Sequence, residues 1–157
     1  DLATGYLHLG NLAKARAAAE RAVRLNGSYS PAHETLGLIR WRGGDASGAI
    51  AAFDRSEQLD PRNVRALVWK GMVETNDGRA ADALATFERA ARVDPTSVDA
   101  WVGIANAQLN RRDMAAAEAA LRNAQRLQPD RPSVKATADR LRSSQMEGHR
   151  SPDPRAR

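Results

Sequence analysis

The sequence predicts an all-α protein made of a repeated unit of 34 residues. Three prolines set this period, at Pro61, Pro95 and Pro129. The same step separates Phe53, Phe87 and Leu121, then Ala49, Ala83 and Ala117, and then Gly37, Gly71 and Ala105. A fixed period of this length indicates a repeat array in which each unit packs on its neighbours. Alanine, the strongest helix former, is abundant, so each unit is predicted to be helical.

Apolar residues at helical spacing, interrupted by turn residues, predict paired helices and one final helix. The helices are expected at about 1–8 and 12–25, 30–42 and 45–59, 64–75 and 80–93, 97–109 and 113–127, and 132–142. The chain then divides into a partial unit at 1–29, complete units at 30–63, 64–97 and 98–131, a capping helix at 132–144 and a disordered tail at 145–157. The final helix has a thin apolar face and a polar outer face, as a terminal repeat needs for solubility.

Side chains that suit helix ends support these boundaries. Serine and aspartate accept hydrogen bonds from the free amides of a first helical turn. The residues expected to do so are Ser30, Asp45, Ser97 and Asp113. The turn at 110–112 has no glycine, unlike the turns before it. Asn110 is therefore expected to take the left-handed conformation there.

The columns make the chain resemble a tetratricopeptide repeat protein over nearly all of residues 1–144. The family pattern is a large residue and Leu-Gly, then alanines around an aromatic residue, then a closing proline. The matching residues are His33, Leu36, Gly37, Ala49, Phe53, Ser56 and Pro61; Leu67, Gly71, Ala83, Phe87, Ala90 and Pro95; and Trp101, Ile104, Ala105, Ala117, Leu121, Ala124 and Pro129. The resemblance implies antiparallel helix pairs stacked into a right-handed superhelix. It also implies that the first helices line the concave side, where partners usually bind.

Polar residues depart from the family pattern at two kinds of position. Lys70 stands where the family has an apolar residue. Arg40, Glu74 and Gln108 stand where a tyrosine is common. These three are expected to lie one above the next along the stacked first helices, with Glu74 bridging toward Arg40.

A further set of first-helix residues is not needed for the repeat core and is predicted to line the concave groove. Trp41, Trp69 and Met72 are the expected apolar anchors, because aromatic residues and methionine are typical of binding surfaces. The full set is Leu38, Trp41, Arg42, Arg65, Val68, Trp69, Met72, Asn76, Asp99, Val102, Asn106 and Leu109. The alternative is that Trp41 and Trp69 pack between neighbouring helices of the array.

The composition argues against several kinds of chemistry. There is no cysteine, and no histidine has a second one four residues away, so neither a metal nor another cofactor is expected. The acidic residues are dispersed, so neither catalytic residues nor enzyme activity is expected. Without a long apolar run or a signal-peptide pattern, no direct membrane contact is expected, and the compartment, cytoplasmic or periplasmic, stays open. The net charge of +5 permits acidic partners, but nucleic-acid binding is not expected, because no aromatic platform accompanies the arginines.

The predicted function is a protein–protein interaction scaffold whose groove binds a protein or peptide segment with apolar anchors. A C-terminal carboxylate, the ligand of chaperone-type members, is not expected, because Val68 and Val102 stand where a lysine would be needed. One alternative is a recruiting module of a larger chain, or of a bacterial envelope-assembly complex, that begins upstream of Asp1. Another is self-association through the cut N-terminal repeat. A third is a basic convex surface on the arginine-rich second helices, in contact with phosphate or acidic lipid.

Overall fold

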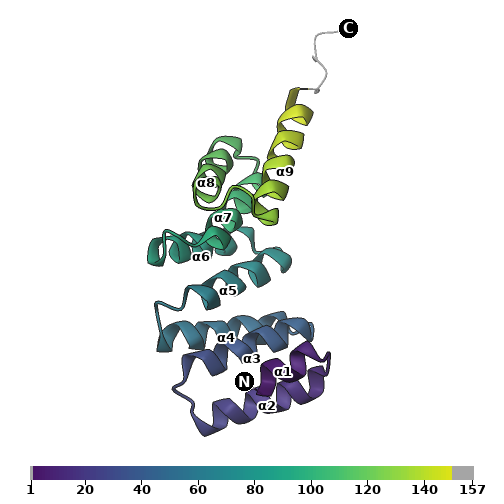
Figure 1. Ribbon diagram of the computed structural model, residues 1–157, viewed down its shortest axis with the longest axis vertical. Helices are drawn as coiled ribbons and strands as arrows, with labels where there is room; N and C mark the ends of the chain where they lie inside the picture. The colour runs from purple at the N-terminus through teal and green to yellow at the C-terminus, as the bar shows by residue number, and fades with distance from the viewer. Residues whose placement is uncertain (1, 150–157) are drawn as a thin grey trace.

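A computed structural model describes residues 2–149, and the side chains of residues 2–146. Within this range the chain forms nine α-helices and no strand. They are α1 (Leu2–His8), α2 (Leu12–Leu25), α3 (Ser30–Arg42), α4 (Ala46–Leu59), α5 (Val64–Asn76), α6 (Ala80–Val93), α7 (Val98–Asn110), α8 (Met114–Leu127) and α9 (Pro132–His149). Figure 1 shows successive helix pairs stacked along the long axis, with α1 and α2 at one end and α9 at the other. The predicted all-α solenoid is confirmed.

The core follows the columns of the repeat. Phe53, Phe87 and Leu121 are 1%, 3% and 3% exposed and lie on the second helices α4, α6 and α8. The alanine column of Ala49, Ala83 and Ala117 is also buried. Small residues let paired helices approach closely, and the large column fills the space between them. The expected burial of the large column is therefore confirmed.

The last helix is longer than expected. The sequence predicts a capping helix that ends by residue 144, followed by a disordered tail, whereas α9 continues to His149. That prediction is wrong for residues 145–149. Between Pro132 and Gly148 no proline or glycine interrupts α9, and Arg142 pairs with Asp139 at 3.2 Å, so the helix has no reason to stop earlier. The remainder of the predicted tail, 150–157, lies outside the described residues.

Three of the four predicted side-chain caps are present. Backbone amides donate to Asp45 Oδ1, Ser97 Oγ and Asp113 Oδ1 at 2.8, 3.4 and 3.0 Å. Ser30 is the exception, because it lies inside α3 and its hydroxyl donates to the carbonyl of Ser56 at 2.9 Å. Both serines are buried, so this bond satisfies polar groups at the contact between α3 and α4 instead of capping a helix.

The turns between paired helices contain one left-handed residue each. It is glycine in the first three turns, at Gly10, Gly44 and Gly78, and Arg112 (φ 61°) in the fourth. These positions are 34 residues apart, so Arg112 occupies a glycine column. The prediction of Asn110 for this role is wrong, because Asn110 is the last residue of α7.

Arg112→Gly is expected to stabilise the protein by about 0.5–1 kcal/mol, because glycine has no Cβ to clash in the left-handed region. A gain of this size raises the melting temperature of a chain of this length by about 2–4 °C. Arg111→Gly is the matched control, because Arg111 has an ordinary φ of −83° and glycine there only adds freedom to the unfolded chain. Thermal melts in which both variants lose stability equally would contradict the assignment.

Candidate functional site

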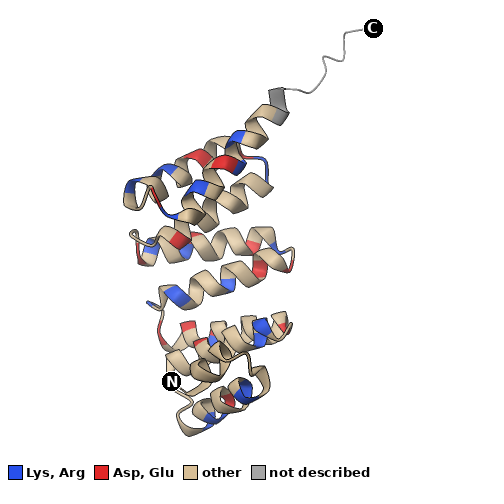
Figure 2. Ribbon diagram, turned by 45° about the vertical axis from the view of Figure 1, so that its right-hand side comes forward, with Lys and Arg blue, Asp and Glu red and all other residues tan. Residues whose placement is uncertain are grey.

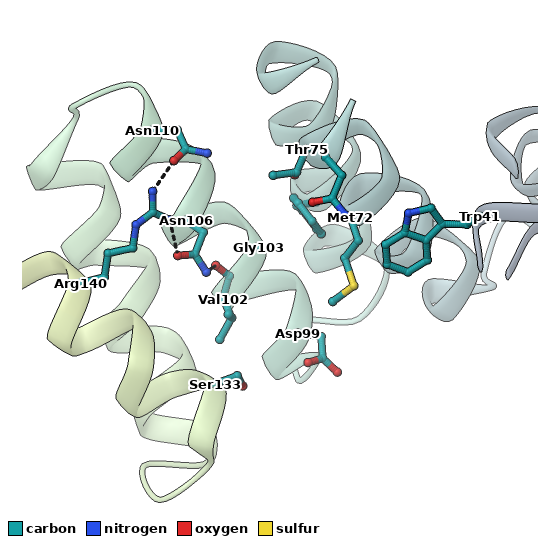
Figure 3. A pocket seen from close by; sticks show the side chains of 12 residues that line it. Trp41, Met72, Thr75, Asp99, Val102, Gly103, Asn106, Asn110, Ser133 and Arg140 are labelled. Carbon is teal, nitrogen blue, oxygen red and sulfur yellow. Dashed lines mark hydrogen bonds between the residues drawn. The ribbon is translucent and has the colours of Figure 1, made fainter. Parts of the chain in front are cut away.

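The first helices α3, α5 and α7, together with α9, form a face that contains two hollows. The central hollow has a volume of about 450 Å³ and lies between α3 and α5 on one side and α7 and α9 on the other (Figure 3). Its lining residues are Trp41, Met72, Thr75, Asn76, Phe87, Asp99, Val102, Gly103, Asn106, Asn110, Ser133 and Arg140. One helix pair alone could not form it, so the hollow exists only because the units are stacked.

A second hollow of about 520 Å³ lies beside the first. Its lining residues are Val64, Arg65, Val68, Trp69, Met72, Asp94, Ser97, Asp99 and Arg131. Met72 and Asp99 line both hollows, so the two are continuous along the same face. Together they form a groove long enough for a short segment of chain.

The two predicted tryptophan anchors contact each other. The rings of Trp41 and Trp69 are 5.6 Å apart between centroids and tilted by 57°, a favourable aromatic geometry. Both are half-buried and pack on a core cluster that includes Phe53, yet Trp41 lines the central hollow and Trp69 the second one. Each tryptophan therefore packs between neighbouring helices and also faces a hollow.

The floor of the central hollow depends on a missing side chain. Gly103 occupies the column that holds Thr35 and Trp69 in the preceding units. A Cβ built at Gly103 would clash with the ring of Phe87, which lies directly beneath it. The glycine thus leaves open space where another repeat has a tryptophan. Sequence reasoning missed Gly103, although its place in the tryptophan column was a visible signal.

The opposite wall is polar and comes from α7 and α9. Arg140 Nη1 donates to Asn106 Oδ1 at 3.0 Å, and its Nη2 donates to Asn110 Oδ1 (Figure 3). Asn106 Nδ2 donates in turn to Val102 O and Thr137 Oγ1, each at 3.1 Å. These bonds fix α9 against α7. Arg140 was missed because it belongs to the final helix, outside the complete repeats.

Carboxylates at the edge of the groove are paired with arginines. Arg131 Nη2 donates to both oxygens of Asp99 at 2.7 and 2.9 Å. Arg65 Nε donates to Glu34 Oε1 at 2.5 Å, and Asn63 Nδ2 donates to the other oxygen of Glu34 at 2.9 Å. Elsewhere, basic and acidic residues alternate along the helices (Figure 2). Within the described part of the chain, no cluster of ligating side chains could hold a metal, and no helix is long and apolar enough to cross a membrane.

Comparison with known families identifies this architecture. Two tetratricopeptide repeat models match the chain, one over residues 1–64 and 34–96 and the other over 75–141. The chain belongs to the tetratricopeptide repeat family. No curated protein sequence matches it.

Solved structures of tetratricopeptide proteins share the fold. pilF of Pseudomonas aeruginosa superposes with a TM-score of 0.83 at 22% identity, over 93% of this chain and 67% of that one. YrrB, described as having an unusual peptide-binding site, gives 0.76 at 20% identity over 87% and 71%. The first tetratricopeptide domain of Spaghetti, bound to an HSP90 peptide, gives 0.70 at 14% identity over 76% and 93%. At these identities the likeness establishes the fold.

Most residues predicted for the groove of this tetratricopeptide chain line one of the hollows. Those that do are Trp41, Arg65, Val68, Trp69, Met72, Asn76, Asp99, Val102 and Asn106. Leu38 instead packs beside Trp41 on the core, and Arg42 is exposed outside both hollows. Leu109 was placed wrongly, because it is 5% exposed and belongs to a core cluster that also contains Val134 and Leu141 of α9.

The predicted ladder of polar residues in the tyrosine column is also wrong. Arg40 Nη1 donates to the carbonyl of Gly48 at 3.1 Å, and Glu74 accepts from Thr86 Oγ1 at 2.8 Å. Each side chain thus turns to the second helix of its own pair, not to the next unit. Lys70 explains the other departure from the family pattern, because it pairs with Asp54 at 2.5 Å.

Glu74→Gln is expected to remove a pH-dependent loss of stability. Burial raises the pKa of Glu74, and the Thr86 hydrogen bond and the Lys70 charge only partly oppose this. The folded state therefore holds a proton that the unfolded state has released. This contribution to stability is complete below the usual glutamate pKa and is lost as pH rises through the raised value. Glutamine can accept the same bond without carrying a charge.

The measurement is thermal unfolding of Glu74→Gln and wild type from about pH 4 to pH 7, which brackets the ordinary glutamate pKa. The variant should match wild type at low pH and become progressively more stable relative to it as pH rises. Glu118→Gln is the matched control, because Glu118 is half exposed and pairs with Arg122 on the surface of α8. A constant difference between Glu74→Gln and wild type across this range would contradict the prediction.

Proposed function

We propose that this tetratricopeptide chain is a protein–protein interaction scaffold that binds a partner segment along the groove formed by the two hollows. The observation that carries the proposal is the half-buried apolar set of Trp41, Met72 and Val102 around a hollow of about 450 Å³. Asparagines and arginines surround these residues, giving the apolar centre and polar rim of an interface. Such a surface fits a side chain of another protein better than water.

Relatives with the same fold support the proposal. The printed descriptions of YrrB and Spaghetti record a peptide-binding site and a bound peptide. The apolar anchors of this chain come from its own residues, so its ligand need not be theirs. The groove spans only the complete repeats and α9, so a short segment with modest affinity is expected. This function requires no catalytic residue.

Met72→Gln is expected to weaken partner binding about thirtyfold, the typical cost of losing an interface anchor of about 2 kcal/mol. Met72 lines both hollows, and glutamine keeps its length while placing a polar group in the groove. Trp41→Ala is a poorer choice, because the contact with Trp69 makes it costly to stability as well. The measurement is titration of a peptide selected from a displayed library against the whole chain.

Met114→Gln is the matched control. Met114 is also half-buried and packs on the same core cluster as Met72, but it lies on the second helix α8, away from the groove. The two variants should lose similar stability, and only Met72→Gln should lose binding. Equal binding by both would move the binding surface elsewhere, with the arginine-rich second helices as the next candidate.

A second candidate function is self-association through the N-terminal unit. Large apolar side chains are exposed there, namely Leu2, Leu9, Leu25 and Tyr29. Exposed apolar residues gathered in one unit favour a contact with another surface. Sedimentation equilibrium tests it: a monomer mass at high protein concentration would exclude this function and leave the groove proposal intact.

A further inference from the structure

We propose that the segment bound in the central hollow carries a bulky apolar side chain, which sits over Gly103, and an acidic side chain, which pairs with Arg140. This inference rests on the proposed function and defines the chemistry of the partner. It follows from one unpaired charge, one fixed side-chain orientation and one gap in the wall of the groove.

The charge on Arg140 has no carboxylate partner among the described residues, unlike the other arginines of the groove. Arg65 pairs with Glu34, and Arg131 pairs with Asp99. Arg140 is exposed and bonds only to the neutral amide oxygens of two asparagines. Asp99 is the single carboxylate in the lining of the central hollow, and Arg131 already neutralises it. The polar wall of the hollow is therefore positive.

The orientation of Arg140 is already suited to a ligand. A guanidinium carries five N–H donors, and Asn106 and Asn110 accept from two of them. The remaining donors can form charge-assisted bonds with an incoming carboxylate. Because the asparagines hold the planar group in place, less side-chain entropy is lost on binding than for a free arginine.

The apolar end of the site lies across the hollow from Arg140. Figure 3 shows Trp41 and Met72 on one side and Arg140 on the other, with Gly103 between them. The missing side chain at Gly103 leaves room above the buried ring of Phe87. A volume of about 450 Å³ is ample for one aromatic or leucine side chain. A ligand that fills the hollow must then be apolar at one end and anionic at the other.

An internal acidic side chain fits this site better than a chain terminus. The central hollow continues into the second one through Met72 and Asp99, so a segment can pass along the groove instead of ending in it. Arg140 is the only cationic side chain in the described lining of the central hollow, and the groups around it are amides. A side-chain carboxylate needs no more than one such partner.

The experiment is a selection from a library of peptides displayed as N-terminal fusions, so that no peptide ends in a free carboxylate. The bait is the whole chain, with Met72→Gln and Arg140→Gln as parallel baits. Wild type should enrich peptides that combine an aromatic residue or leucine with aspartate or glutamate. The best peptide, made with an amidated C-terminus, should bind Arg140→Gln about tenfold more weakly, as expected for a hydrogen bond to a charged group.

Two controls isolate the charge pair. Arg142→Gln should bind as wild type does, because Arg142 lies on the same helix but pairs with Asp139. Replacing the acidic residue of the peptide by its amide should cost about tenfold on wild type and nothing further on Arg140→Gln. The peptide change requires no altered protein, so misfolding of a variant cannot explain the result.

The outcomes separate the two proposals. Peptides that depend on Met72 but not on Arg140, or that show no acidic preference, would overturn the charge pairing and leave the groove function standing. Binding that requires a free terminal carboxylate would overturn the pairing with an internal side chain. Peptides unaffected by Met72→Gln, or a selection that enriches none, would overturn both.

Discussion

Phe87→Ala is expected to lower the free energy of unfolding by about 3–5 kcal/mol, the usual range for a buried phenylalanine. The ring is 3% exposed and lies beneath two glycines, Gly71 on α5 and Gly103 on α7. It therefore fills space between the first helices of two successive units. Removing it leaves a cavity that neither unit can close alone, and stability in a solenoid depends on such contacts between neighbours.

Chemical denaturation followed by circular dichroism measures this loss. Val93→Ala on the same helix is the control, because Val93 is exposed and its truncation should cost little. Leu121→Ala, in the same column of the next unit, should cost about 2–5 kcal/mol. If Phe87→Ala cost no more than Val93→Ala, the assignment of this column to the core would be wrong.

The period of 34 residues predicted the fold because each unit repeats the same geometry. A residue of the Phe53 column meets the same neighbours in every unit, so its burial could be read from spacing alone. Details that depend on one unit were harder to predict. Ser30 bonds to Ser56 only because serines stand at both positions, and Arg112 is left-handed only because its column requires it.

The groove was predictable where it depends on first-helix residues outside the core columns, such as Trp41, Met72 and Val102. Leu109 was misplaced because its burial depends on packing in a cluster shared with α9, which has no counterpart in the repeat pattern. Gly103 escaped notice because it contributes space and not a side chain. The ladder from Glu74 to Arg40 failed because the second helix of each pair offers a nearer partner than the next unit does.

Gly71→Ala is expected to cost about 1–3 kcal/mol, toward the upper end of that range, because it overpacks the core. A Cβ at this position would lie 2.7 Å from Phe87 Cε1, and the ring cannot retreat, because Gly103 is equally close on its other side.

Phe87→Leu in the same chain should recover part of that loss, because the next unit carries the compatible pair, alanine at Ala105 and leucine at Leu121. A double-mutant cycle by chemical denaturation should give a favourable coupling of about 1 kcal/mol or more. Gly5→Ala is the control: a Cβ there meets nothing within 4 Å, so alanine should stabilise α1. If the costs of Gly71→Ala and Phe87→Leu simply add, the two positions do not constrain each other, and the glycine column needs another explanation.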